Sequence, residues 1–161
     1  MSDENQPPDL LTLDALQRDL LIPQIQAFLD ATSDAAARES YGALKAAVES
    51  MAVSAEHQVR LGTIVEVALQ SGRIRRLFGS GAELSLNALF QKTPRGREIA
   101  RSLRELNAAL SKLKGDTVEE VSAVARGPGS WALSVKTSGC QLVLRFERDS
   151  VRVETLEVAL G

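Results

Sequence analysis

The spacing of the apolar residues changes at Gly115, and this change constrains the fold more than any other feature of the 161-residue chain. Before Gly115, apolar residues recur every three or four positions, which is typical of one face of an α-helix. After it they alternate with polar residues, as in a strand with one buried face. The sequence therefore predicts an α+β fold, in which an N-terminal bundle of four to five helices precedes a C-terminal antiparallel sheet.

The acidic, proline-bearing segment at residues 1–9 is expected to be a disordered leader. Residues 10–92 are expected to form the helical region. Thr12 is the predicted N-cap of its first helix, because a threonine hydroxyl can accept a hydrogen bond from a free backbone N–H. Pro23 should kink or divide this helix, which is expected to end near Ala31.

Polar residues also mark the beginnings of the next two helices. Ser33 or Asp34 is expected to begin the second helix, and Ser54 the third. Gly72 is expected to end the third helix, because glycine readily adopts the left-handed conformation found after helix C-termini.

The last two predicted helices lie on either side of Thr93. Residues 73–92 fit both strand and helix spacing, and we favour a helix with Ser80 as its N-cap. Thr93 and Pro94 fit the N-cap and the first position of the next helix. Its apolar residues form a row with small or neutral flanks, which favours packing on a sheet over a coiled coil. This row consists of Ile99, Leu103, Leu106, Leu110 and Leu113.

The C-terminal residues are predicted to form a four-stranded antiparallel β-meander with one apolar face. Glycine- and serine-containing turns separate the strands. A β-bulge near Thr155 is expected, because it would keep the apolar residues of the last strand on one face. The helix after Thr93 should cover that face, and residues 93–161 should pack with 10–92 as one domain. The predicted strands are Val118–Ala125, Trp131–Thr137, Gln141–Glu147 and Val151–Leu160.

Charge is unevenly distributed along the chain. The formal net charge is −2 overall, but it is −7 over residues 1–59, +7 over 60–114 and −2 over 115–161. The simpler interpretation is that acidic and basic helices lie side by side. The alternative is that the basic block meets an anionic partner.

Several classes of chemistry are disfavoured by composition. A single cysteine, Cys140, and a single histidine, His57, cannot form a disulfide or a multi-histidine zinc site within one chain. No nucleophile-elbow motif, secretory signal or membrane-length apolar run is present. We therefore expect a cytoplasmic protein that is not an enzyme, with no catalytic residue, metal or cofactor.

Two groups of arginines are candidate contacts for phosphate, nucleotide or nucleic acid. Backbone N–H groups at a helix start favour anions, and nearby arginines would add charge. Glu98 and Glu105 lie near Arg101 and are expected to pair with it, as on a solvated helix face. The candidate residues are Arg73, Arg75, Arg76, Gly79, Ser80, Gly81, Arg97, Arg101 and Arg104.

The leading functional hypothesis is a non-catalytic interaction or regulatory module that self-associates as a homo-oligomer or binds a protein partner. Its basis is an excess of alanine- and leucine-rich helical surface over what one small sheet can cover. The alternative is binding of nucleic acid or another anionic ligand through the basic block at residues 73–114.

Overall fold

A computed structural model describes residues 10–148 and 150–159, so the predicted leader at 1–9 lies outside the described residues. The described residues form five helices followed by a four-stranded antiparallel sheet, which confirms the predicted α+β class. It divides into two compact units, Met1–Arg97 and Glu98–Gly161. The expectation that residues 10–92 and 93–161 pack as one domain stays a prediction.

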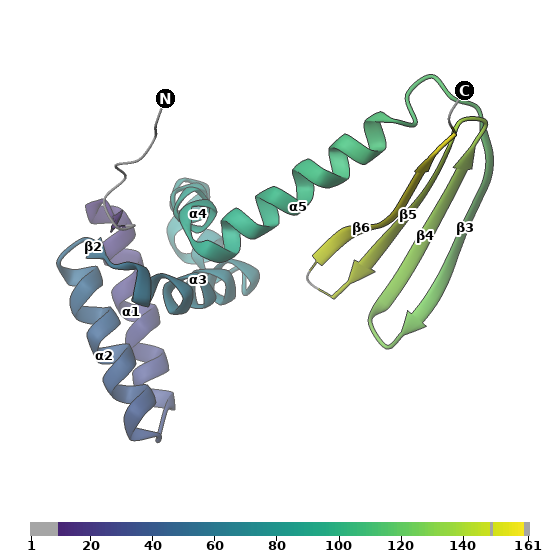
Figure 1. The fold of residues 1–161 in the computed structure, drawn as a ribbon. Helices are drawn as coiled ribbons and strands as arrows, with labels where there is room; N and C mark the ends of the chain where they lie inside the picture. Colours follow the sequence, from purple (N-terminus) through teal and green to yellow (C-terminus); the bar gives the residue numbers. More distant parts are fainter. Residues whose placement is uncertain (1–9, 149, 160–161) are drawn as a thin grey trace, which may run out of the picture. The chain divides into compact units, whose positions relative to one another are not determined.

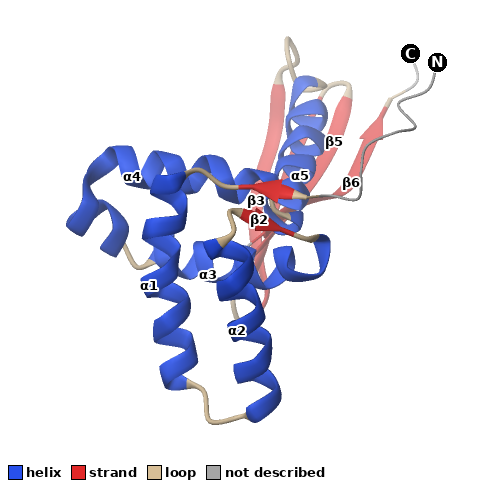
Figure 2. Cartoon of the chain, turned by 90° about the vertical axis from the view of Figure 1, so that its left-hand side faces the viewer, coloured by secondary structure: helices blue, strands red, loops and turns tan. Residues whose placement is uncertain are grey.

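The first unit contains four helices and a two-stranded ribbon (Figure 1). Helix α1 packs against α2 and α4, and α3 packs against α4. The ribbon is antiparallel and joins the segment before α1 to the segment before α3 (Figure 2). The elements are β1 (Leu11–Thr12), α1 (Ala15–Ala31), α2 (Ala35–Glu49), β2 (Ala52–Val53), α3 (Ala55–Gln70) and α4 (Arg73–Lys92).

The predicted N-cap of the first helix is wrong. Thr12 lies in β1, where its backbone pairs with that of Ala52, so it is a strand residue and not the residue that precedes the helix. Asp14 is the N-cap instead: its side chain accepts a hydrogen bond from Gln17 N at 2.8 Å, and the Gln17 side chain returns one to Asp14 N at 3.1 Å. This reciprocal pair is a capping box. The helix ends at Ala31, as predicted, and Pro23 does not divide it.

The predicted ends of α2, α3 and α4 are partly confirmed. Asp34 caps α2 by accepting a hydrogen bond from Ala37 N at 2.7 Å. Ser54 occupies the N-cap of α3, and Gly72 follows its last turn with a positive φ of 66°. Residues 73–92 are helical, but the break falls at Gly79 (φ 87°, ψ 176°) rather than at Ser80 as a cap. Glycine takes this backbone conformation because it has no Cβ.

The core of the first unit is one apolar cluster drawn from all four helices and the ribbon. Leu21 and Ile25 of α1, Leu44 of α2, Leu61 of α3 and Leu86 of α4 are each fully buried. This unit therefore has an apolar core of its own, although Leu77, Phe78 and Leu84 of α4 are more than half exposed.

The start of helix α5 (Pro94–Ser111) is fixed by Thr93, as predicted. Thr93 is completely buried, and its hydroxyl donates to the Phe90 carbonyl oxygen at 2.6 Å and accepts from Gly96 N at 3.2 Å. A Cβ on Gly62 of α3 would lie 3.2 Å from that hydroxyl oxygen. Gly62 therefore permits close approach of the α3 backbone to Thr93.

The second unit contains the rest of α5 and a sheet in the order β3-β4-β5-β6, with every neighbouring pair antiparallel. Turns are predicted at 127–129, 138–139 and 148–150; the first two connect the first three strands, although Gly127 itself belongs to β3. The third predicted turn includes Asp149, which lies outside the described residues. The strands are β3 (Val118–Gly127), β4 (Ser130–Thr137), β5 (Cys140–Glu147) and β6 (Ser150–Val158).

The predicted bulge in the last strand is present. Val153 pairs with Leu144 and Thr155 pairs with Val143, so Glu154 is the extra residue. The extra residue restores the phase of the alternation, because Leu156 then pairs with Leu142 on the same face as Val153. Leu160, the predicted end of this strand, lies outside the described residues.

The C-terminal part of helix α5 contacts one face of the sheet through a small apolar cluster. Ala109 packs with Leu142 and Leu144, and Leu106 and Leu113 flank the contact. Part of the predicted leucine row therefore covers the sheet, as the small residues around it suggested.

Candidate functional site

Strand β3 is the most exposed apolar element of the second unit. All ten of its residues, Val118–Gly127, are exposed. The buried cluster beneath α5 draws its sheet residues from β4, β5 and β6 and, among the described residues, takes none from β3. We refer to Val118–Gly127 as the β3 surface.

The β3 surface combines valine side chains with an unpaired backbone edge. Val118 is 55% exposed, Val121 58% and Val124 50%. Because β3 ends the strand order and pairs with β4 on one side, the outer side presents unpaired N–H and C=O groups in the described structure. Between the irregular positions near Glu119 and Arg126, the pairing with β4 is regular. This regular segment can accept another strand.

The apolar face of the sheet continues this surface onto β4 and β5. Ala125 pairs with Trp131, and Trp131 pairs with Phe146. Trp131 is 57% exposed and Phe146 38%. Leu103 and Leu110 of α5 are also exposed, so the helix covers the apolar face incompletely. The expectation that the helix covers this face is thus met only where Leu142 and Leu144 lie.

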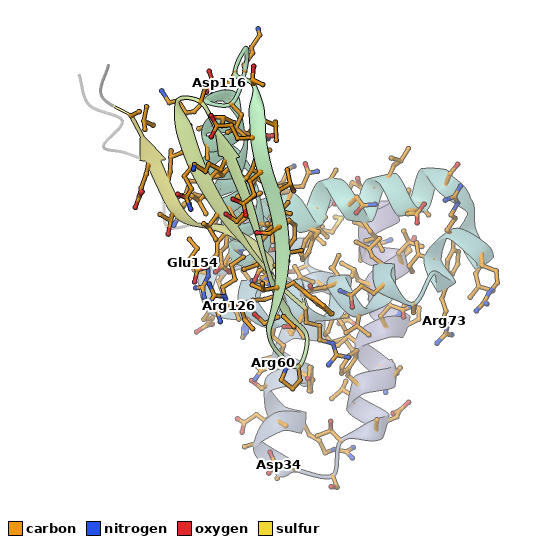
Figure 3. All side chains as sticks on the ribbon, turned by 90° about the vertical axis from the view of Figure 1, so that its right-hand side faces the viewer. Asp34, Arg60, Arg73, Asp116, Arg126 and Glu154 are labelled. Atoms are coloured by element: carbon orange, nitrogen blue, oxygen red, sulfur yellow. The ribbon has the colours of Figure 1, made fainter. Side chains whose placement is uncertain are left out.

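The opposite face of the sheet is polar and internally paired. Arg145 lies 3.2 Å from Glu147 and 3.5 Å from Glu154, and Arg152 lies 3.0 Å from Glu147. Arg126 of β3 approaches Glu154 to 3.9 Å (Figure 3). These contacts are typical of a solvated face, which leaves the apolar face and the β3 edge as the unusual surfaces of this unit.

The arginines of α4 lie on an exposed, kinked helix. Arg73, Arg75 and Arg76 are exposed in the turns before the kink, and Arg75 lies 3.7 Å from Glu83. Gly79, Ser80 and Gly81 are exposed as well; Gly79 is the non-helical break within α4, so Ser80 and Gly81 lie at the start of its second helical segment.

The three arginines predicted on α5 are divided between the units. Arg97 belongs to the first unit, and Arg101 and Arg104 belong to the second. All three are exposed. Over residues 10–148 and 150–159, no ion pair forms at Arg101 or Arg104, so the expected pairing of Arg101 with glutamates on its own helix is wrong. Both guanidinium groups face water.

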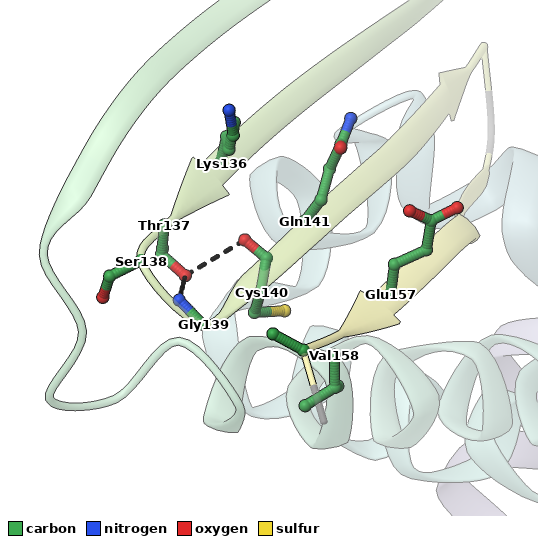
Figure 4. A pocket seen from close by; sticks show the side chains of 9 residues that line it. Lys136, Thr137, Ser138, Gly139, Cys140, Gln141, Glu157 and Val158 are labelled. Atoms are coloured by element: carbon green, nitrogen blue, oxygen red, sulfur yellow. Dashed lines mark hydrogen bonds between the residues drawn. The ribbon is translucent and has the colours of Figure 1, made fainter. Parts of the chain in front are cut away.

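A depression of about 310 Å³ lies at the end of the sheet where β4, β5 and β6 meet (Figure 4). The Thr137 hydroxyl is 2.8 Å from the Asp116 carboxylate and 3.0 Å from the Cys140 carbonyl oxygen. Cys140 itself is buried. These hydrogen bonds hold the turn and the start of β5, which is a structural role.

His57 and the acidic residues give no further site. His57 lies 3.3 Å from Glu56, and its side chain is mostly buried. Within the described ranges, His, Cys, Asp and Glu do not cluster in threes with the spacing of a metal site. None of the described helices combines the length and apolar character needed to cross a membrane.

Comparisons with protein-family models, curated proteins and solved structures find no match to this chain. Our sequence reasoning located β3 but missed its exposure. A signal was present in the strand itself, because its valines at 118, 121 and 124 are not confined to one strand face.

Proposed function

We propose that this chain is a non-catalytic interaction module that associates through the β3 surface. The observation that carries this proposal is an edge strand of ten exposed residues whose central part, Val121–Ala125, is uncharged. Soluble proteins usually protect such edges with charges, proline or a covering element. An unprotected edge supports strand addition, in which the backbone of a partner hydrogen-bonds to the free edge.

The exposed side chains beside β3 support the same function. Val121, Trp131 and Phe146 lie on one face and are each more than a third exposed. Contiguous apolar surface of this kind is typical of protein–protein contact sites. A partner strand at β3 would extend this face.

The proposal is tested by placing a charge on the β3 edge. Val121→Lys should weaken association strongly, because lysine on an edge strand opposes further pairing. The measurement is the molar mass by light scattering over a dilution series from high to low micromolar protein. The matched control is Val158→Lys on the other edge strand, β6, where the valine is 53% exposed against 58% for Val121. Equal effects of the two substitutions, or a strictly monomeric parent chain, would rule the proposal out.

A second candidate, binding of an anionic partner, is favoured by one observation. Arg101 and Arg104 have no ion pair within the part of the chain that the structure describes. Contacts to nucleic-acid phosphates would weaken steeply with salt. Retention of the chain on DNA or RNA at low salt, lost in the Arg101→Ala/Arg104→Ala variant, is the expected result; no retention at low salt excludes this candidate.

A further inference from the structure

We propose that the partner at the β3 surface is a second copy of this chain, paired antiparallel through β3 about a two-fold axis at Ala123. This inference rests on the proposed function and specifies its partner and register. In such a dimer, β3 of each copy adds to the edge of the other, and the two sheets become one sheet of eight strands. The pairing is isologous, so the same residues of both copies form the contact.

The position of the axis follows from the charges of β3. Glu120 lies three residues before Ala123, and Arg126 lies three residues after it. In an antiparallel pair centred on Ala123, Glu120, at the start of the regular segment, therefore stands opposite Arg126 of the partner subunit, which is the irregular position directly after that segment. The symmetry repeats this contact, so the dimer gains two cross-strand pairs of opposite charge.

Both side chains are available for these contacts. Glu120 pairs with Lys136 through the backbone ladder, but its carboxylate has no ion pair among the residues that the structure describes. The salt bridge of Lys136 goes to Glu119 instead, at 3.9 Å. Arg126 is half exposed, and its intramolecular contact with Glu154 is long, at 3.9 Å. Glu154 also has a closer partner in Arg145.

Neighbouring registers lack this complementarity. An axis at Ser122 would place Glu120 opposite Val124 of the partner subunit, and an axis at Val124 would place Arg126 opposite Ser122 of the partner subunit. A shift by one residue therefore loses both charge pairs. The axis at Ala123 also sets Val121 opposite Ala125 of the partner subunit, which keeps the apolar residues of both copies on one face.

Disulfide trapping tests the register in the full chain. In a Cys140→Ala background, Ala123→Cys should form an intermolecular disulfide under mild oxidation, because residues directly opposite in an antiparallel pair have Cα atoms about 4.5–5.5 Å apart. The matched control is Ala125→Cys on the same strand and the same face. In the proposed register, position 125 of one copy and position 125 of the other are four residues, or about 13 Å, apart along the strands, so two cysteines there cannot form this bond.

Charge reversal tests the contact itself. Glu120→Arg or Arg126→Glu should each weaken self-association about tenfold, because two attractive contacts become repulsive. A mixture of the Glu120→Arg chain and the Arg126→Glu chain should form a heterodimer, since both contacts are then attractive again. Light scattering and native mass spectrometry measure these species directly.

The outcomes separate this inference from the proposed function. Val121→Lys could weaken the dimer while Ala123→Cys forms no disulfide and neither charge reversal changes association. This result would support association through the β3 surface and overturn the register proposed here. A parent chain that stays monomeric throughout overturns both. A disulfide at Ala123→Cys, with recovery of association in the mixture, supports the two-fold pair.

Discussion

The two units of this protein bury their apolar side chains to very different extents. The first unit encloses one large cluster in which side chains from all four helices are fully buried. In the second unit, α5 covers a small cluster around Leu142 and Leu144, while β3 and the Trp131 end of the sheet stay exposed. The larger apolar core therefore lies in the first unit, although Leu77, Phe78 and Leu84 of α4 are more than half exposed, whereas most of the exposed apolar surface of the second unit lies on its sheet.

The largest expected effect comes from truncating the core of the first unit. Leu21→Ala should lower the free energy of unfolding by about 2–5 kcal/mol, because it removes buried methyl groups and leaves a cavity. Leu77→Ala is the control, since Leu77 is 59% exposed in the described structure and should change stability by less than about 0.5 kcal/mol.

Two spectroscopic probes show which unit Leu21→Ala affects. Far-ultraviolet circular dichroism is dominated by the helices, whereas Trp131, the single tryptophan of the chain, reports on the sheet. Urea titration should shift the helical transition and leave the Trp131 fluorescence transition in place. A common shift of both would show that the units unfold together, in agreement with the one-domain expectation.

A smaller effect of unusual sign is expected at Gly96. Replacing a helical glycine by alanine commonly stabilises a protein, by about 0.4–1 kcal/mol. A Cβ at Gly96, however, would lie 2.7 Å from Gln91 Cα and would crowd the Phe90 carbonyl group. Gly96→Ala should therefore destabilise the first unit by about 1–3 kcal/mol.

Gly42 of α2 provides the matched control for Gly96. No atom lies within 4 Å of a Cβ built there, so Gly42→Ala should show the ordinary stabilisation. The urea midpoint, followed by circular dichroism, measures both variants. Equal shifts for the two alanines would contradict the tight packing that we describe around Thr93.

The smallest effect is expected on the β3 surface. Val121→Thr keeps the shape of an exposed side chain and should change the stability of the second unit by less than about 0.5 kcal/mol. The same substitution at Val53, which is fully buried in the first unit, should cost about 1–3 kcal/mol because a hydroxyl is buried. Thermal unfolding measures both; similar losses would remove the contrast between the units.

Local signals predicted most of the fold. The change in spacing at Gly115 predicts the four strands, whose observed bounds differ by at most two residues at the ends that the structure describes. The bulge near Thr155 could be predicted because two apolar runs of one strand are out of phase. Thr93 could be identified as an N-cap because the following Pro94 is well suited to a first helical position.

Non-local contacts account for what the sequence could not predict. Thr12 was a reasonable cap by residue type, but its pairing with Ala52, forty residues away, is not visible in local spacing. The candidate site depends on where α5 lies on the sheet. Spacing identifies the apolar face, but it does not predict that the cluster beneath α5 draws on β4 to β6 and leaves β3 exposed.

The extra residue in β6, Glu154, has a consequence for the size of the assembly. A bulge bends and twists the strand that carries it, so at Glu154, in the middle of β6, this strand offers a poor template for a further strand, whereas the irregular positions of β3 lie near its ends and leave Glu120–Ala125 regular. A sheet with one edge strand available for pairing can add one partner sheet, after which no further strand can be added. If β3 is that edge strand, the complex closes at two chains and cannot extend into a fibre.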